Sequence, residues 1–258
     1  MTYAICTVSA APIRKEPNHR SEMTSQLLFG ETLFILETSN EWIKIRGTYD
    51  GYEGWCTDHL VAFVAAETAL APTAYVTTGL LNEMKWGTAL FQIPMGCSLT
   101  GFNVAKRLLW DQRYEFLGLF RNVEQPYTKE LFQNTIRPWL NAPYLWGGKT
   151  FMGVDCSGFV QTVFKVLGIP LLRDAYQQAG QGMPVVDLES ATAGDLAFFS
   201  NTDGRIIHVG FVLDGKKIIH AAGTVRIDTL TPEGIFIEST GRQTHQLHSF
   251  RRMATFSN

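Results

Sequence analysis

The chain has 258 residues and a formal net charge of −2, with 45% hydrophobic and 18% charged residues. This composition supports packed cores and excludes a disordered chain. It shows no electrostatic footprint for nucleic acid, and no apolar run of ~18 residues that could span a membrane. The N-terminus, residues 1–8, lacks a basic region followed by an apolar stretch, so we expect no signal peptide, although a chain trimmed of its signal would look the same.

Four cysteines occur without a Cys-x-x-Cys pair: Cys6, Cys56, Cys97 and Cys156. This spacing disfavours a zinc knuckle or a thioredoxin-type motif. The size of the chain and the lack of a signal favour free thiols over two disulfides. We interpret three of the cysteines as small buried apolar residues and ask whether the fourth differs.

The first part of the chain, residues 1–65, is expected to be a small all-β barrel. Apolar and β-branched residues predict strands at 32–36 and 41–46. The dipeptides Asp50-Gly51 and Glu53-Gly54 indicate turns, and a further short strand begins at Gly54. Short strands with frequent turns are typical of small barrels.

The middle part, residues 66–125, is expected to be a second, diverged copy of this barrel. Strands are predicted at 75–78 and 90–93, with a turn at 94–96. Residues 126–258 form the last predicted domain. It opens with a predicted helix from Thr128, a candidate N-cap, to Leu140, although Pro138 makes the end of that helix uncertain.

From residue 141 the pattern changes to a helix followed by strands. Apolar residues at 156, 159, 160, 163, 164 and 167 form a helical stripe from Asp155 to Gly168. Gly168 is a natural C-terminal stop. Apolar strands are predicted at 195–199, 206–213 and 217–221. This order predicts an α+β domain, with a helix packed on an antiparallel sheet.

Cys156 lies in the first turn of the predicted helix. Free backbone N–H groups and the positive end of the helix dipole stabilise a thiolate there, so we expect a depressed pKa. The same N–H groups can hold an oxyanion on an attacked carbonyl. Cys156 would then be a nucleophile. The alternative is that Cys156 is only the first residue of the apolar stripe.

The hairpin after this helix carries His208 and His220. A two-residue Asp214-Gly215 loop would put the two histidines on opposite faces. A three-residue loop from Leu213 to Gly215, with Gly215 left-handed, would pair them directly, with Cβ atoms ~5 Å apart. We expect the second register, in which one imidazole holds the other in its working tautomer.

Other arrangements of the histidines are less favoured. A metal site made of Cys156, His208 and His220 is conceivable for zinc, but no fourth ligand is evident in the sequence. Each of the two histidines taken singly resembles an ordinary core histidine. The remaining histidines, which we interpret as surface residues, are His19, His59, His245 and His248.

The segments 143–148, 153–159 and 208–211 together resemble the NlpC-type bacterial cell-wall cysteine peptidases. The similarity covers about residues 125–250. It implies a papain-like fold with Cys156 as nucleophile, His208 as base and His220 as orienting residue. It further implies that Tyr144 lines the oxyanion and substrate region, and that no metal or organic cofactor is needed.

The N-terminal region is similar to the bacterial SH3-like domains that accompany this family. The segments 26–31, 42–44 and 51–55 carry this similarity. Together with residues 173–178, the arrangement resembles cytosolic γ-D-glutamyl-L-diamino acid endopeptidases of murein recycling. The resemblance implies a peptide such as L-Ala-γ-D-Glu-diamino acid as substrate. It also implies that the first SH3-like domain closes one end of the groove, so that a free N-terminal L-Ala is required.

A free ammonium group needs an acidic or phenolic partner where it is buried. The residues that we expect to contact the substrate are Asp155, Ser157, Arg173, Tyr52 and an acid, Glu22 or Glu16. Each has a plainer interpretation: Asp155 as the helix N-cap, the two glutamates as solvated residues, and Tyr52 as a neighbour of Trp55. Related sequences often carry a serine where this chain has Ala175, which puts the contact to the amine end in doubt.

The resulting hypothesis is a cytoplasmic, monomeric cysteine endopeptidase that cuts the γ-D-Glu to diamino acid bond and binds neither nucleic acid nor membrane. One alternative is a periplasmic or secreted hydrolase of intact wall, from which a signal peptide has been removed. Another is a non-catalytic wall-binding or peptide-binding module. The complete set of Cys156, His208 and His220 argues against the last alternative, although fold similarity alone does not decide function.

Overall fold

The computed structural model describes residues 2–110, 113–253 and 255–256, and the chain divides into two compact units. One unit contains residues 1–126 together with 146–151, and the other contains residues 127–145 and 152–258. The chain therefore leaves the second unit after Leu145, contributes a short segment to the first, and returns at Met152. Within the described ranges, no helix has the length and apolar character needed to cross a membrane.

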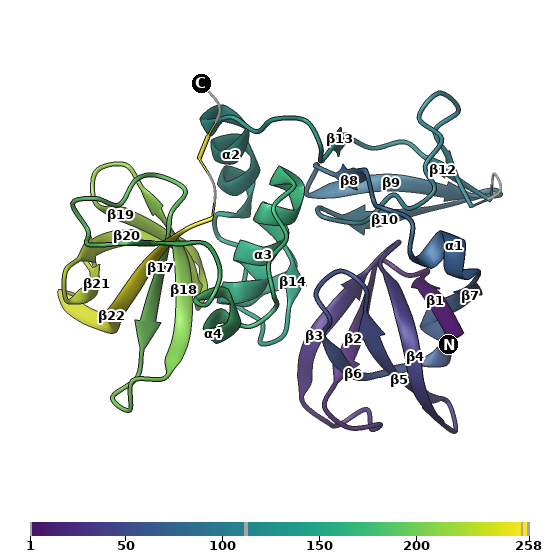
Figure 1. The fold of residues 1–258 in the computed structure, drawn as a ribbon, viewed down its shortest axis with the longest axis horizontal. Coiled ribbons are helices and arrows are strands. Elements are labelled where there is room, and N and C mark those ends of the chain that lie inside the picture. Colours follow the sequence, from purple (N-terminus) through teal and green to yellow (C-terminus); the bar gives the residue numbers. More distant parts are fainter. Residues whose placement is uncertain (1, 111–112, 254, 257–258) are drawn as a thin grey trace. The chain divides into compact units, whose positions relative to one another are not determined.

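The beginning of the first unit is all-β, as the sequence predicts. Seven antiparallel strands form one sheet in the order β3-β2-β6-β5-β4-β1-β7 (Figure 1). Its core contains Ala4, Leu33, Ile45 and the free cysteines Cys6 and Cys56. The elements are β1 (Thr2–Cys6), β2 (Ala10–Arg14), β3 (Met23–Leu28), β4 (Thr32–Ser39), β5 (Trp42–Gly47), β6 (Glu53–Thr57), the 3-10 helix η1 (Asp58–Leu60) and β7 (Val61–Val64).

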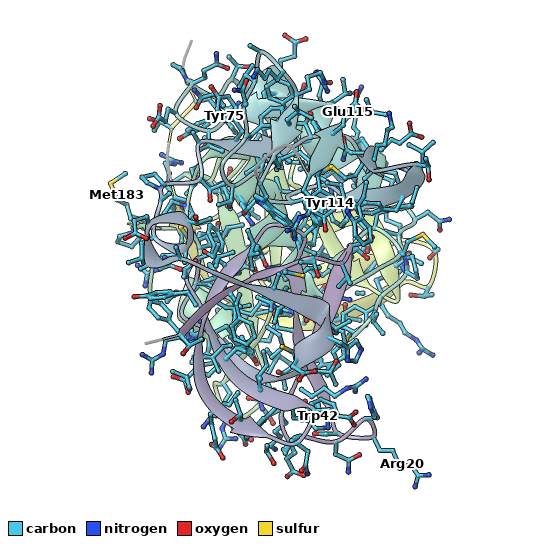
Figure 2. All side chains as sticks on the ribbon, turned by 90° about the vertical axis from the view of Figure 1, so that its right-hand side faces the viewer. Arg20, Trp42, Tyr75, Tyr114, Glu115 and Met183 are labelled. Atoms are coloured by element: carbon cyan, nitrogen blue, oxygen red, sulfur yellow. The ribbon has the colours of Figure 1, made fainter. Side chains whose placement is uncertain are left out.

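The middle region forms two smaller sheets, β10-β9-β12-β11 and β13-β8. Tyr114 belongs to its buried core, and Tyr75 is partly buried and packs against that core. Both residues are labelled in Figure 2. Leu28, at the end of β3, and Phe29, which follows it, also belong to this core. Its origin as a second copy of the first barrel stays a prediction. The elements are α1 (Ala66–Ala69), β8 (Tyr75–Thr77), β9 (Leu81–Trp86), β10 (Ala89–Pro94), β11 (Leu108–Leu109), β12 (Tyr114–Phe116) and β13 (Phe120–Asn122).

The second unit is α+β, as predicted. Its sheet has the order β16-β22-β17-β18-β19-β20-β21, and β22 also pairs with β21, so the sheet closes on itself. The elements are α2 (Lys129–Ile136), the 3-10 helix η2 (Arg137–Trp139), β15 (Gly153–Val154), α3 (Cys156–Leu167), α4 (Ala175–Gln178), β16 (Met183–Val185), β17 (Leu196–Ser200), β18 (Ile206–Leu213), β19 (Lys217–Ala222), β20 (Thr224–Thr231), β21 (Gly234–Ile237) and β22 (Arg242–Arg252).

Helix α3 is the central helix of the second unit, and every residue in it is buried. Asp155 caps its start by accepting a hydrogen bond from the Gly158 amide at 2.7 Å. Gly168 ends it in the left-handed conformation, with a φ of +85°. Phe159 and Phe164 pack on Phe211 of β18, with ring centroids 5.6 and 5.1 Å apart, so the helix is fixed on the sheet. The predicted bounds of this helix are confirmed.

The helix predicted at 128–140 is confirmed in its first part only. Thr128 is its N-cap and accepts a hydrogen bond from the Leu131 amide at 3.1 Å. The α-helix ends at Ile136 and continues as the 3-10 turn Arg137–Trp139, which contains Pro138. Proline lacks an amide hydrogen and its ring clashes with the preceding turn, so the regular helix stops before it.

The register predicted for the β18–β19 hairpin is wrong by two residues. Gly210 pairs with His220 and Leu213 with Lys217, which leaves residues 214–216 as the loop. Gly215 is left-handed as expected, with a φ of +72°, but Lys216 is left-handed too, at +56°. Because side chains alternate along a strand, a shift of two residues keeps His208 and His220 on one face. They are therefore diagonal neighbours and not a direct pair.

The segment 146–151 is held in the first unit by polar contacts. Lys149, in the short strand β14 (Lys149–Thr150), places its Nζ 3.2 Å from Oε1 of Glu31, and both side chains are almost fully buried. The Lys149 amide donates to Gln26 Oε1 at 2.8 Å. Gly147 is left-handed at a φ of +76°, and a Cβ there would lie 2.5 Å from the carbonyl oxygen of Met23. The ion pair and this close approach tie the segment to β3 and its end.

Lys149→Met is expected to destabilise the first unit by about 3–5 kcal/mol, because it removes one partner of a buried ion pair and leaves the Glu31 charge in a dry site. Urea unfolding followed by tryptophan fluorescence measures this loss. Lys216→Met is the matched control: its pair with Glu189 is exposed, so the change should be within about 1 kcal/mol. Equal effects of the two substitutions would contradict the buried pair's role.

Candidate active site

Cys156 is the first residue of α3 and is only 6% exposed. Burial raises the pKa of its thiol to about 12, and the Asp155 carboxylate raises it further. Hydrogen bonds from the backbone at Val209 and Ser157, and the charge of Arg173, lower this pKa but do not balance burial. The predicted depression of the pKa is therefore wrong for this state. Loss of hydration around a thiolate outweighs the free amides of the first helical turn.

His208 and His220 are two members of a line of hydrogen-bonded side chains, which Asp228 completes. Nε2 of His208 lies 2.8 Å from Nδ1 of His220, and both rings are buried. Burial lowers the pKa of His208 well below its ordinary value and that of His220 to about 4. Both imidazoles are therefore neutral at neutral pH. The Val209 backbone forms a hydrogen bond with the Cys156 sulfur, and Val209 follows His208 directly in the chain.

Gly210 leaves room for the side chains of His220 and Ile218 on the neighbouring strand. It is paired with His220 across the β18–β19 ladder, and a Cβ on it would lie 2.7 Å from the His220 Cβ. Without that Cβ, the imidazole of His220 reaches diagonally toward His208. The glycine is visible in the sequence segment His208–Phe211. The role of Gly210, however, depends on which residues of β18 and β19 pair with each other.

Asp228 extends the line and was missed by the sequence reasoning. Its Oδ2 lies 3.0 Å from Nε2 of His220, and Arg226 holds the same carboxylate through contacts of 2.6 and 2.8 Å. Asp228 is buried, and it lies on β20, where Arg226 pairs with His220. An acid two residues beyond the cross-strand partner of His220 was the available signal. To recognise this signal, one must know that β20 is the strand next to β19 in the sheet.

His245 is not a surface residue, contrary to the sequence interpretation. It is half-buried, and its ring centroid lies 4.4 Å from that of His208 at an angle of 34°. It comes from β22, where its φ is +52°. The other three histidines interpreted as surface residues, His19, His59 and His248, are exposed.

Tyr144 is a further residue close to the Cys156 sulfur. Its amide donates to the Gly223 carbonyl at 2.8 Å, and it forms a parallel bridge with Val154 at the start of the segment leading to Cys156. Burial raises the pKa of its phenol, and the charges of Cys156 and Asp155 raise it further. The phenol is therefore a neutral hydrogen-bond donor close to the sulfur, as a residue of the oxyanion region must be.

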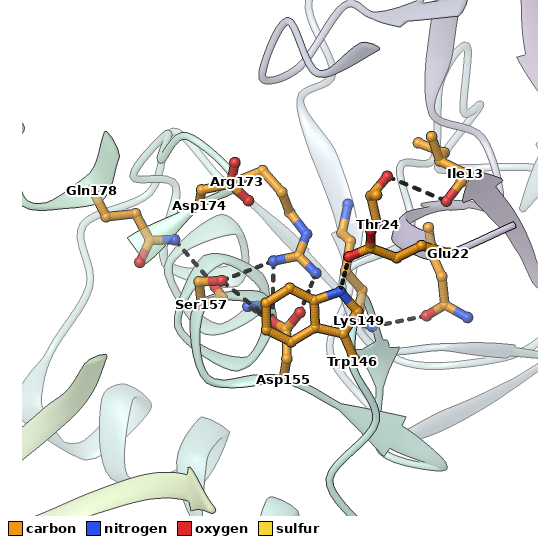
Figure 3. A network of polar contacts seen from close by, with 12 residues as sticks. Ile13, Glu22, Thr24, Trp146, Lys149, Asp155, Ser157, Arg173, Asp174 and Gln178 are labelled. Atoms are coloured by element: carbon orange, nitrogen blue, oxygen red, sulfur yellow. Dashed lines mark hydrogen bonds and ion pairs between the residues drawn. The ribbon is translucent and has the colours of Figure 1, made fainter. Parts of the chain in front are cut away.

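Asp155, Ser157 and Arg173 form a buried network at the start of α3 (Figure 3). Arg173 donates to both carboxylate oxygens of Asp155, at 3.0 and 2.6 Å, and to Ser157 Oγ at 2.8 Å. Ser157 Oγ lies 3.3 Å from Asp155 Oδ1. A two-pronged pair of this kind fixes the first turn of the helix. Ala175 is buried at the beginning of α4, directly after Asp174.

Glu22 and Tyr52 lie together in the first unit. They line one hollow with Lys15, Thr24, Lys44, Glu53, Gly54 and Trp55. Glu22 is exposed, and its Oε1 accepts a hydrogen bond from the Trp146 indole at 2.8 Å (Figure 3). Glu16 is exposed on the same barrel and does not line this hollow. Of the two acids considered from the sequence, Glu22 is the one beside Tyr52.

A buried thiol, a neutral imidazole and a hydrogen-bonded line of side chains behind that imidazole suit nucleophilic catalysis with proton transfer. The thiol does not need to be ionised in advance, since an imidazole can take its proton as the sulfur attacks. Among the described residues, no group of three or more His, Cys, Asp or Glu side chains has the arrangement of a metal site.

Comparison with known proteins agrees with these features. Residues 141–242 match the NlpC/P60 family, and residues 13–66 match the bacterial dipeptidyl-peptidase SH3 domain. A γ-D-glutamyl-L-lysine dipeptidyl-peptidase of Bacillus subtilis is 29% identical over 80% of this chain and 76% of its own length. The murein DD-endopeptidase/LD-carboxypeptidase MepS of Escherichia coli is 34% identical over 48% of this chain and 60% of its own length.

A crystal structure of an NlpC/P60 family protein from Bacillus cereus has a TM-score of 0.80 to this chain, at 21% identity, over 97% of this chain and 99% of that one. It supports the fold. The chain thus carries an NlpC/P60 peptidase domain preceded by an all-β, SH3-like region.

Gly210→Ala is expected to lower kcat at least 10-fold, because the new Cβ displaces the His220 imidazole from His208. Peptide hydrolysis and thermal unfolding are measured together. Gly215→Ala is the matched control in the same hairpin: it strains a left-handed residue by about 1 kcal/mol but meets no atom within 4 Å. Its kcat should stay near that of the wild type. A wild-type kcat in Gly210→Ala would refute the role of this gap.

Alkylation of Cys156 by iodoacetamide should keep rising with pH into the alkaline range, because the resting thiol is neutral and its pKa is about 12. Mass mapping of the labelled peptide follows Cys156 separately from the other three cysteines, which are also buried. A rate that is already constant between about pH 5 and 8 would instead indicate a preformed thiolate–imidazolium pair.

Proposed function

We propose that this NlpC/P60 protein is a cysteine endopeptidase that hydrolyses the γ-D-Glu to diamino acid bond of murein peptides with a free N-terminal L-Ala. One observation carries the proposal: Cys156 at the start of the buried helix α3, beside the line from His208 to His220. This is the nucleophile, base and orienting group that acyl transfer to a thiol requires.

The reaction follows from the protonation states. His208 takes the proton of the Cys156 thiol while the sulfur adds to the carbonyl carbon of the γ-D-Glu residue. The oxyanion that forms is stabilised by backbone N–H groups at the start of α3 and by the Tyr144 phenol. The C–N bond then breaks, and His208 gives its proton to the leaving amine of the diamino acid. A water molecule, deprotonated by His208, hydrolyses the thioester and restores the thiol.

The proposed specificity for the γ-D-Glu bond is supported by the similarity to a curated relative and by a hollow in the first unit. The Bacillus subtilis relative is a γ-D-glutamyl-L-lysine dipeptidyl-peptidase, which names the same class of bond. An enzyme that releases a dipeptide must recognise the amine end of its substrate. We propose that the hollow with Glu22 and Tyr52 binds this ammonium group, since a carboxylate and a phenol are suitable acceptors for it.

Asp155 and Arg173 have a different role in this proposal. Their charges are paired with each other in the buried network, and the Ser157 hydroxyl contacts both. We propose that they act on the substrate through the position of the helix start, with Tyr144 as the residue that touches the reacting carbonyl. Their substitution should thus lower kcat more than it raises KM.

The test is mass spectrometry of L-Ala-γ-D-Glu-meso-diaminopimelate incubated with the full chain. Release of L-Ala-D-Glu by the wild type and not by Cys156→Ala is expected, while the N-acetylated peptide stays intact. Glu22→Gln should raise KM about 10-fold or more, since it removes one charge from the amine site. Glu16→Gln, an exposed acid outside the hollow, is the matched control and should leave KM unchanged.

Other outcomes separate the alternatives. Equal cleavage of the free and acetylated peptides would overturn the amine requirement and favour a hydrolase of intact wall. No cleavage of either peptide by a folded protein with a reactive Cys156 would overturn the bond assignment. Binding of wall fragments without any cleavage would point to the non-catalytic module.

A further inference from the structure

We propose that Asp228 is a positioning residue that sets the tautomers of both buried histidines and so makes His208 a base toward Cys156. The inference deepens the proposed function and rests on it for the identity of the reaction. It does not rest on the substrate, because the tautomers are a property of the free protein.

The inference starts from the acceptor at the end of the line. Arg226 contacts both oxygens of the Asp228 carboxylate, through Nε at 2.6 Å from Oδ2 and through a guanidinium nitrogen at 2.8 Å from Oδ1. A carboxylate held by a guanidinium through both oxygens accepts hydrogen bonds and has none to donate. The nitrogen of His220 that faces it, Nε2 at 3.0 Å, must therefore carry the hydrogen.

The hydrogen on Nε2 determines the other end of the His220 ring. Burial lowers the pKa of His220 to about 4, so the ring is neutral and has a single N–H. Its Nδ1 is then an acceptor. Because Nδ1 lies 2.8 Å from His208 Nε2, the His208 nitrogen must be the donor. The neutral His208 ring thus keeps its lone pair on Nδ1.

The line uses Nε2 of His208, so Nδ1 is the nitrogen that remains, and we propose that it faces the Cys156 thiol. With its lone pair there, His208 can take the Cys156 proton. If the line were reversed, Nδ1 would carry a hydrogen and could not act as a base. The direction in which the N–H groups of the line donate therefore decides whether His208 can act as a base toward Cys156. Asp228, two hydrogen bonds away from His208, sets that direction.

The position of Asp228 follows from the sheet. His220 on β19 pairs with Arg226 on β20, and Asp228 lies two residues further on the same face. Two diagonal steps across neighbouring strands, from His208 to His220 and from His220 to Asp228, give one continuous line. The charged and titratable groups that face His220 are Arg226 and Asp228 from β20, His208 from β18 and His245 from β22.

Asp228→Asn is the decisive variant. An asparagine of the same shape can turn its NH₂ toward His220 Nε2 and donate, which reverses the line and places a hydrogen on His208 Nδ1. We expect kcat to fall about 10⁴-fold, the order found when the acid behind a catalytic histidine is replaced by its amide. Alanine has no hydrogen-bonding group, so Asp228→Ala favours neither tautomer of His220. We therefore expect a smaller loss in kcat than in Asp228→Asn, even though the shorter side chain leaves a cavity.

The matched control is Asp195→Asn. Asp195 is also a buried acid of the same unit and is paired with Arg252 at 2.7 Å, but it precedes Leu196 at the start of β17, whereas His208 pairs with Phe199 near the end of that strand. It should lose stability to a similar degree and keep the wild-type tautomers. An equal fall in kcat per folded molecule in Asp195→Asn would show that the effect of Asp228→Asn is only structural, and would overturn the proposal.

The tautomers are read directly by ¹⁵N NMR of histidine-labelled protein without substrate. In the wild type, Nε2–H is expected on both His208 and His220. In Asp228→Asn, Nδ1–H is expected on both, with slower alkylation of Cys156 at neutral pH. Nδ1–H on wild-type His208, or unchanged tautomers in a folded Asp228→Asn, would overturn the proposal. Because this measurement needs no peptide, a wild-type protein with the expected tautomers but no murein peptidase activity would sink only the proposed bond specificity.

Discussion

Loss of hydration around α3 controls the chemistry of the second unit. Cys156, His208, His220 and Asp228 are all nearly closed to solvent, where an unpaired charge is costly. The acids in this region are paired: Asp228 with Arg226, and Asp155 with Arg173. The thiol and the imidazoles are neutral at rest, since burial raises the pKa of the one and lowers those of the others. In the proposed mechanism, the thiol and the imidazole become charged only when a substrate is attacked.

In a neutral site of this kind, the reactivity of the thiol depends more on which nitrogens carry hydrogens than on which groups are ionised. A thiolate formed in advance would react whatever the tautomer of its neighbour. A buried thiol instead needs an imidazole with a lone pair directed at it, which explains why polar residues continue behind His208 to Asp228. Gly210 belongs to the same region, because a Cβ on it would lie 2.7 Å from the Cβ of His220. Aromatic packing of α3 on Phe211 keeps helix and hairpin in place.

The chain passes from the second unit into the first and back within one short segment. Residues 146–151 follow Leu145 in sequence and precede the residues that lead to Cys156, yet they belong to the first unit. The buried pair of Lys149 and Glu31 fixes the segment there.

The sequence by itself determined the features that depend on neighbouring residues. The Asp155 cap, the apolar stripe and the Gly168 stop fix α3, and with it the place of Cys156, because helix signals act within a few residues. The alternating strands and turn glycines indicate the β-rich first region for the same reason. Only the tertiary structure decided the hairpin register, the depth of burial that raises the thiol pKa, and the parts of Asp228 and His245. These depend on which strands become neighbours and on how much water the packed unit excludes, and neither is a property of a short stretch of chain.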